Sequence, residues 1–306
     1  MTSARRLFGM LLGDRLATIS AIFLIALILA VIFVPMFSSP TASLNLMMRN
    51  APPALNHGIA YLLGGDTLGR AILPRLLEGG RGTLLVAVAV VILSGAVGAL
   101  LGLLAGYYGR LVDSFVMRTS DVVMSFPSLL LAVIILYMFT PSITNVIIVL
   151  AITRTPVYIR VTRAETLEVR GRLFVEGARA AGATDLRILG VHIAPIIFPT
   201  IFTLASLDFA NVMLAESSLS FLGIGVQPPA VTWGLMVANG RDYLTTAWWL
   251  AFWPGFAIVL TALAANLLSN WVRIAMDPKL SWRLQRPSWR KSAKPARKVA
   301  IEEKAS

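Results

Sequence analysis

Side chains that could carry out catalytic chemistry are scarce in this sequence of 306 residues, which has no cysteine and only two histidines. His57 and His192 lie far apart, and no His-Glu-x-x-His pattern occurs, so no cysteine or histidine metal site is expected. A P-loop needs a lysine after a glycine-rich run, but the first lysine is Lys279, near the C-terminal end. We therefore expect no catalytic residue, metal or cofactor on this chain.

Two carboxylates remain as chemical candidates, because Asp208 and Glu216 lie in the apolar stretch 198–219. A bare carboxylate at the centre of a bilayer costs roughly 2.5–3.5 kcal/mol on insertion scales. Both should therefore face a partner, a polar cavity or the interior of a helix bundle, and their spacing allows them to share one side of a helix. Lining of a transport pathway and hydrogen bonding between helices both fit, and Asn211 and Ser217 belong to the same class.

The composition indicates the environment of these residues. The chain is 57% hydrophobic and 14% charged, which is too apolar for an ordinary soluble domain. Several stretches approach the length needed to cross about 30 Å of hydrocarbon, namely residues 16–37, 84–107, 122–139, 143–159, 198–219 and 247–268. The fourth contains Arg154 and Pro156. We therefore expect an all-α polytopic membrane protein with about six transmembrane helices.

The formal net charge of +12 is better explained by a cytoplasmic membrane surface and anionic lipid than by nucleic acid, since no nucleic-acid-binding module is visible. If the N-terminus lies inside, most of the 27 Lys and Arg residues fall in cytoplasmic segments. The exceptions are Arg49, Arg70, Arg75, Arg81 and Arg241. The positive-inside rule thus predicts that both termini are cytoplasmic.

Three parts of the chain follow from this reasoning. Residues 1–15 form a cytoplasmic N-terminal arm, and residues 16–278 form the membrane domain. Residues 279–306 are rich in Lys, Arg, Ser, Pro and Ala, and we expect this basic tail to be disordered in the cytoplasm.

A polar segment, RLFVEGARAAGATDLRILGVHIAP, separates the fourth and fifth stretches at residues 172–195. Its first helical run ends near Gly182, which can adopt the left-handed backbone at a helix end. Thr184 is typical of an N-cap, with Asp185 in the first turn that follows, and Pro195 either limits the second helix or kinks its entry into the next span. We predict a cytoplasmic helical hairpin, whose apolar face either lipid or the groove of a partner protein must cover.

The spacing within this hairpin carries a family resemblance. Residues 176–178 (EGA), Gly182 and Pro195 resemble the EAA loop of bacterial ABC importer permeases, which has Glu-Ala-Ala, three residues, Gly, nine residues and Ile-x-Leu-Pro. The departures are Gly177, His192 and Ala194. The resemblance implies that residues 170–195 form the coupling helix, which sits in a cleft of a cytoplasmic ATPase subunit. The implied coupling residues are Glu176, Gly177, Ala178, Gly182, Asp185 and Pro195.

Further blocks resemble the dipeptide/oligopeptide/nickel subfamily of these permeases. GGDTLGRAILPRLLEGGRGTLLV, residues 64–86, is similar to its Gly-Thr-Asp-x-Leu-Gly-Arg-Asp segment, and DVVMSFPSLLLA, LAESSLSFLGIGVQPP, WGLMVANGRDYL and AMDPKL are similar in turn. The resemblance covers roughly residues 60–282. It implies a type I ABC importer fold, the shorter C-type permease of a pair, and an outer face that meets a binding protein. The residues expected on that face are Asp66, Arg70, Arg75, Arg241 and Asp242.

By this resemblance the chain is a non-catalytic permease subunit of an ATP-driven importer for peptides or a related small solute. It would lie in the bacterial inner membrane with a second permease, two ATPase subunits that bind ATP and magnesium, and an external solute-binding protein. The alternative is an ion-coupled secondary transporter that uses Asp208 and Glu216. Such transporters usually show internal repeats, and none is visible here.

Small residues recur at four-residue spacing in the second stretch, at Ser94, Gly98, Gly102 and Gly106. A stripe of small residues lets two helices approach closely in lipid. Both tight packing within this subunit and a moving interface with a second permease subunit fit this pattern.

Overall fold

The computed structural model describes residues 9–37, 45–55 and 57–276. Every secondary-structure element named within these ranges is a helix. The α-helices are α2 (Arg15–Phe37), α3 (Ile72–Tyr108), α4 (Arg110–Met124), α5 (Ser128–Tyr137), α6 (Ile143–Arg170), α7 (Leu173–Ala180), α8 (Asp185–Arg187), α9 (Ala194–Phe221), α10 (Trp233–Gly240) and α11 (Trp249–Met276). The 3-10 helices are η1 (Leu46–Met48), η2 (Ile59–Tyr61) and η4 (Arg241–Tyr243), and η3 (Ile188–Ile193) is a π-helix. The predicted tail 279–306 and most of the predicted arm lie outside the described residues.

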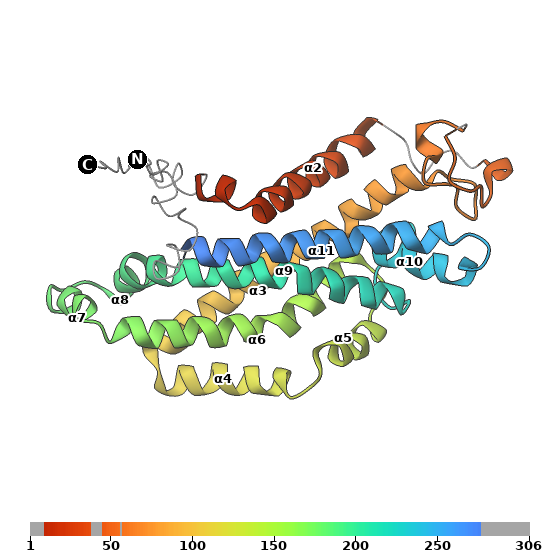
Figure 1. Cartoon of the computed structure of the whole chain (residues 1–306). Coiled ribbons are helices and arrows are strands. Elements are labelled where there is room, and N and C mark those ends of the chain that lie inside the picture. The colour runs from red at the N-terminus through yellow and green to blue at the C-terminus, as the bar shows by residue number, and fades with distance from the viewer. Residues whose placement is uncertain (1–8, 38–44, 56, 277–306) are drawn as a thin grey trace, which may run out of the picture.

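Four long helices, α3, α6, α9 and α11, form the body of a bundle, and α2 runs along its outside (Figure 1). α3 packs most extensively on α6, and α9 packs on both α3 and α11. The helices α7 and α8 lie at one end of the bundle, whereas α10 and the loop before α3 lie at the other (Figure 1). The two ends of the molecule are therefore built from different parts of the chain.

The number of apolar spans agrees with the number predicted from the sequence. Within the described residues, five helices are long and apolar enough to cross a membrane, and α4 and α5 together make a sixth candidate. The span predicted at 122–139 is not a single helix, because it contains the end of α4 and all of α5, which meet at an angle of 84°. Pro127 disfavours helical backbone in the residue before it, and α4 accordingly ends before Phe126.

Two other helices extend beyond the spans predicted at 143–159 and 198–219. α6 continues to Arg170 even though Pro156 lies inside it, because the loss of one backbone donor is outweighed by close packing along α3. The fifth span is part of one helical path, formed by α8, η3 and α9, from Asp185 to Phe221. Pro195 lies in the first turn of α9, where a missing N–H is easily tolerated. It marks a change from π to α geometry and does not end the helix.

The stripe of small residues on α3 faces α6. A Cβ atom on Gly102 would lie 2.6 Å from the carbonyl oxygen of Ile159, and one on Gly106 would lie 2.7 Å from the Cβ of Thr166. Glycine is therefore required for this close approach. The stripe serves packing within the subunit, and the alternative of an interface with a second subunit is wrong for these residues.

Candidate functional site

The predicted hairpin is present and is closed by a tight glycine turn. Gly182 has φ of +83°. Its N–H donates to the carbonyl oxygen of Arg179 (3.0 Å), and the N–H of Ala183 donates to that of Ala178 (3.1 Å). This pair of bonds is a Schellman motif, which satisfies the last carbonyls of α7. Thr184 occupies the N-cap position of α8 as predicted, although its side chain makes no capping hydrogen bond.

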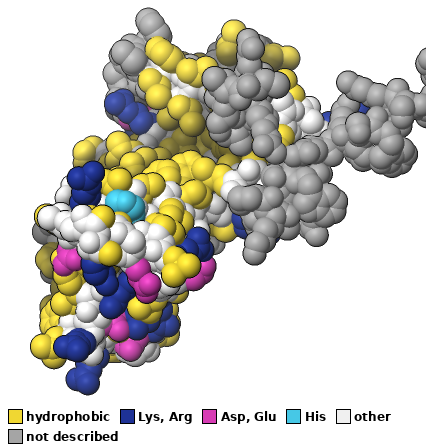
Figure 2. All heavy atoms as spheres, turned by 90° about the vertical axis from the view of Figure 1, so that its left-hand side faces the viewer, with side chains coloured by type: hydrophobic (Ala, Val, Ile, Leu, Met, Phe, Trp, Pro, Cys, Tyr) yellow, Lys and Arg dark blue, Asp and Glu magenta, His cyan; other side chains and the backbone are white. Residues whose placement is uncertain are grey.

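The hairpin has a buried inner face and a bare outer face. Val175 and Ile188 are fully buried in a small core that α3, α6 and α9 complete. Leu173 and Leu186 are 84% and 78% exposed, and no side chain would crowd a Cβ atom at Gly177. Figure 2 looks onto this end and shows basic and acidic side chains gathered around hydrophobic ones.

Five of the six predicted coupling residues lie on this hairpin. Glu176, Gly177 and Ala178 belong to α7, Gly182 forms the turn, and Asp185 begins α8. Pro195 lies farther along, where α9 begins.

Sequence reasoning missed Tyr107, which lies beneath the hairpin at the end of α3. Its hydroxyl donates to Oδ1 of Asp185 (2.5 Å) and accepts from Nη2 of Arg179 (3.3 Å). Nothing in the spacing of the apolar residues of α3 distinguishes Tyr107 from Tyr108. Only the tertiary contact with the hairpin identifies it.

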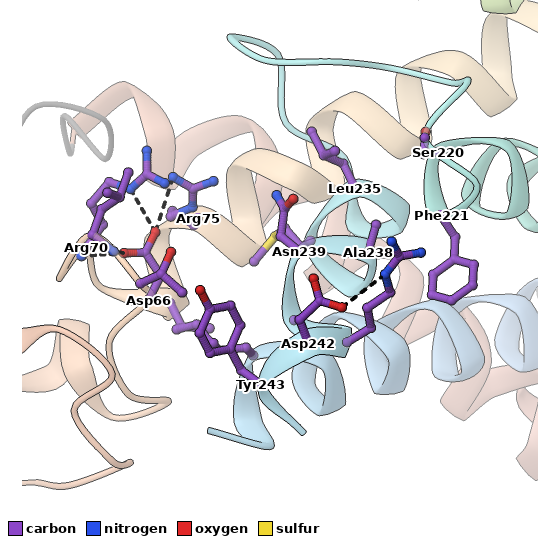
Figure 3. Close-up of a pocket in the computed structure, with 18 of the residues that line it drawn as sticks. Asp66, Arg70, Arg75, Ser220, Phe221, Leu235, Ala238, Asn239, Asp242 and Tyr243 are labelled. Atoms are coloured by element: carbon purple, nitrogen blue, oxygen red, sulfur yellow. Dashed lines mark hydrogen bonds and ion pairs between the residues drawn. The ribbon is translucent and has the colours of Figure 1, made fainter. Parts of the chain in front are cut away.

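A polar pocket of about 550 Å³ lies at the opposite end of the bundle. All five residues predicted for the outer face line it, although they come from segments far apart in the sequence. They are Asp66, Arg70, Arg75, Arg241 and Asp242. In Figure 3, Asp66 and its two arginines lie on one side of the pocket, and Asn239, Asp242 and Tyr243 lie on the other.

Asp66 organises its side of the pocket. Its Oδ1 accepts hydrogen bonds from the backbone N–H groups of Leu68 and Arg70, both at 2.8 Å. Its Oδ2 lies 2.7 Å from Nε of Arg70 and 3.5 Å from Nη1 of Arg75. One carboxylate thus orders the loop and holds two guanidinium groups. Arg241 and Asp242 form a separate, exposed pair with Nε and Oδ1 3.4 Å apart.

The two carboxylates of α9 are buried within the bundle and have partners. Oδ1 of Asp208 lies 3.5 Å from Nη1 of Arg154, and its Oδ2 accepts from the hydroxyl of Tyr158 at 3.3 Å. Oε1 of Glu216 accepts from the hydroxyl of Ser220 at 2.7 Å. These contacts account for how α9 carries both groups inside an apolar span.

The other two residues predicted with them have different surroundings. Ser217 is buried and donates to Glu216 at 3.4 Å. Asn211 is exposed, and its amide donates to the carbonyl oxygen of Leu207 at 3.4 Å. The four residues of α9 predicted as one class therefore do not converge on one cavity. Among the described residues, no group of three or more His, Cys, Asp or Glu side chains could hold a metal ion.

The chain resembles a known protein in its fold. The chain is similar to a solved structure of the MetNI methionine ABC transporter in an inward-facing conformation, with a TM-score of 0.52 and 17% identity over 70% of this chain and 98% of that one. This likeness supports the type I ABC importer fold.

Sequence relatives are closer. The di/tripeptide transport system permease protein DppC of Pseudomonas aeruginosa is 38% identical over 85% of this chain and 86% of its own length. The probable D,D-dipeptide transport system permease protein DdpC of Escherichia coli is 36% identical over 90% and 91%. The dipeptide transport system permease protein DppC of Escherichia coli is 41% identical over 75% and 77%.

Two family descriptions match the chain. Residues 4–53 match the N-terminal transmembrane domain of oligopeptide transport permease C, and residues 98–282 match the binding-protein-dependent transport system inner membrane component. This family match contradicts the alternative prediction of an ion-coupled secondary transporter. The chain belongs to the family of binding-protein-dependent transport system inner membrane components, and it is the non-catalytic, membrane-spanning permease subunit of an ATP-driven importer.

Proposed function

We propose that this permease forms half of the translocation pathway of an importer for short peptides. Its partners are a second, similar permease subunit, two cytoplasmic ATPase subunits and an external solute-binding protein. The peptide substrate is supported by relatives named for di- and tripeptides or D,D-dipeptides at 36 to 41% identity. The binding protein supplies most of the selection among peptides, nickel chelates and other small solutes.

In this proposal the hairpin end of the bundle faces the cytoplasm of a bacterial inner membrane, and both termini lie on the same side. Positive charge favours the cytoplasmic side of a membrane protein. The hairpin and the adjoining ends of α6 and α8 carry Arg163, Arg170, Arg172, Arg179 and Arg187. ATP and magnesium bind to the ATPase subunits, because a P-loop needs a lysine that residues 1–278 lack.

The observation that carries the proposal is the bare outer face of the hairpin. Leu173 and Leu186 are exposed on a short, polar element whose inner face is already packed against the permease itself. Exposed leucines of this kind favour the groove of a partner protein. Closure of the ATPase subunits around ATP would push on the residues of the turn, and the membrane helices would change from inward-open to outward-open.

The exposed side of α9 is the proposed wall of the pathway. Asn211 and Ser218 are exposed there, and polar groups at such positions in a membrane-spanning helix need water or a partner. Asp208, Glu216 and Ser217 lie behind this wall. Asp208 holds α9 to α6 through Arg154, whereas Glu216 is bonded to Ser217 and Ser220 within α9 itself.

The polar pocket at the other end is the proposed contact for the binding protein. Arg241 and Asp242 are exposed and can pair with charges on that protein. Asp66, Arg70 and Arg75 shape the opposite wall of the pocket.

Replacement of Leu186 by Asp tests the proposed ATPase contact. Full burial of one leucine contributes about 1.5–3 kcal/mol, so we expect recovery of the ATPase subunits with the tagged chain to fall by about tenfold or more. ATP-driven dipeptide uptake should fall with it. The measurement is co-purification from membranes, together with uptake of labelled dipeptide.

Leu46 provides the matched control, because it is 72% exposed in η1 at the opposite end of the bundle. Leu46→Asp should leave ATPase recovery unchanged. Full recovery of the ATPase subunits with Leu186→Asp would contradict the coupling role of the hairpin. Uptake of a nickel chelate without uptake of dipeptide would contradict the peptide substrate.

A further inference from the structure

Tyr107 joins four elements at the hairpin end of the bundle. It lies in the last turn of α3, is 4% exposed, and its ring packs in the core that contains Val175 of α7 and Ile188 of η3. The proposed function assigns force transmission to the hairpin but leaves open which contacts carry that force into the membrane helices.

The hydroxyl of Tyr107 bonds to both arms of the hairpin. It donates to Oδ1 of Asp185 at 2.5 Å, and Asp185 is the first residue of α8. It accepts from Nη2 of Arg179 at 3.3 Å, and Arg179 lies in the last turn of α7. A single oxygen atom therefore holds the segments on either side of the Gly182 turn.

The ring of Tyr107 adds contacts that the hydroxyl does not make. The guanidinium carbons of Arg170 and Arg179 lie 6.0 and 5.8 Å from its centroid, within the range of a cation–π interaction. Nη1 of Arg170 also donates to the carbonyl oxygen of Gly106 at 3.4 Å. The end of α6 is thus tied to the end of α3 at the same place.

The segments that connect the hairpin to α6 and α9 explain why the contacts of Tyr107 are useful. Gly171 connects α6 to α7, and the π-helix η3 connects α8 to α9. Glycine is conformationally permissive, and π-helical turns are frequent at functional sites. Apolar packing alone has no directional preference, so a hairpin held only by its apolar face could rock about these joints.

We propose that Tyr107 is a positioning residue that locks both arms of the hairpin to α3, so that displacement of the hairpin moves the membrane helices and is not absorbed at the joints. This inference rests on the proposed coupling of the hairpin to an ATPase. Since α3 packs closely on α6 along its glycine stripe, a displacement applied at Tyr107 moves α3 and α6 together.

Tyr107→Phe tests the two hydrogen bonds of the hydroxyl directly, because the ring and its contacts with both arginines remain while the hydroxyl is removed. The experiment uses the complete complex in proteoliposomes, with binding protein and labelled dipeptide. The measured quantity is the number of dipeptides imported per ATP hydrolysed. We expect this ratio to fall about fivefold, the change that corresponds to one net hydrogen bond, while the ATPase subunits still co-purify.

Tyr108→Phe is the matched control. Tyr108 is the next residue of α3, is 45% exposed, and its ring lies edge-on to that of Tyr107 with centroids 5.2 Å apart. We expect the wild-type ratio for this variant. A rescue series uses Asp185→Asn, which keeps an acceptor for the phenol, and Asp185→Ala, which does not. We expect Asp185→Asn to retain more coupling than Asp185→Ala.

The results that would overturn the positioning role of Tyr107 differ from those that would overturn the proposed function. A wild-type ratio for Tyr107→Phe, an equal loss for Tyr108→Phe, or loss of the ATPase subunits from the Tyr107→Phe complex would each overturn the positioning role. A wild-type complex that contains no ATPase subunits, or that imports no dipeptide, would overturn the proposed function itself.

Discussion

Asp208 is a charged side chain placed near the middle of a long apolar helix, α9, and Arg154 holds the corresponding place in α6. Each would be costly in a bilayer without a partner. Their side chains lie 3.5 Å apart, and Tyr158 donates to the same carboxylate. Each charge therefore reduces the cost of placing the other in the bilayer, and their contact joins α6 to α9.

Removal of one member of this pair should destabilise the protein more than removal of both. Asp208→Ala leaves Arg154 without its counter-ion, and we expect a loss in the free energy of unfolding on the order of 3 kcal/mol. The double variant with Arg154→Ala should recover part of that loss. Thermal unfolding in detergent micelles measures both.

Asp242→Ala removes a carboxylate whose side chain is 74% exposed, and it should leave the unfolding temperature nearly unchanged. Additive losses in the Asp208/Arg154 double variant would contradict the coupling of the two residues.

The association of α3 with α6 depends on glycine at the positions where the two backbones meet. Gly98 lies against the Cβ of Tyr158, and Gly102 lies against the backbone of Ile159. The four-residue spacing predicted a close helix contact, but spacing alone did not identify the helix on the other side. The structure assigns that side to α6.

Alanine at Gly102 and at Gly95 should have opposite effects. A Cβ atom at Gly102 would lie 2.6 Å from a carbonyl oxygen, whereas one at Gly95 would lie 3.5 Å from Cε1 of Tyr158, an ordinary contact. We expect Gly102→Ala to cost about 1–3 kcal/mol of stability through overpacking. Gly95→Ala should be neutral or stabilise the helix by up to about 1 kcal/mol. Unfolding temperatures of the two variants provide the measurement, and equal shifts would contradict the packing described here.

α3 connects the two ends of the whole molecule. Its 37 residues span about 55 Å at 1.5 Å per residue, more than the roughly 30 Å of hydrocarbon. Ile72 and Arg75, at its start, line the polar pocket, and Tyr107, near its end, holds the hairpin. One continuous helix therefore reaches from the proposed binding-protein contact to the proposed ATPase contact.

The proposed orientation predicts which side of the membrane each end occupies. The chain contains no cysteine, so a single introduced cysteine is a specific probe. In spheroplasts, a membrane-impermeant maleimide should label Thr245→Cys, which is exposed between α10 and α11, without permeabilisation. Ala181→Cys, exposed beside the hairpin turn, should react only after permeabilisation. Labelling of Ala181→Cys in intact spheroplasts would contradict a cytoplasmic hairpin.

The membrane class, the number of spans and the hairpin with its turn at Gly182 were all predictable from the sequence. Hydropathy, charge bias and the backbone preference of glycine act within a few consecutive residues. The contacts between Asp208 and Arg154 and between Tyr107 and Asp185 were not predictable. The pocket that residues 66–75 and 241–242 line together was not predictable either. Apolar side chains surround most of α3 and α9, so periodicity does not reveal which side of each helix faces its neighbours. Only the rotation and packing of the helices bring those distant residues together.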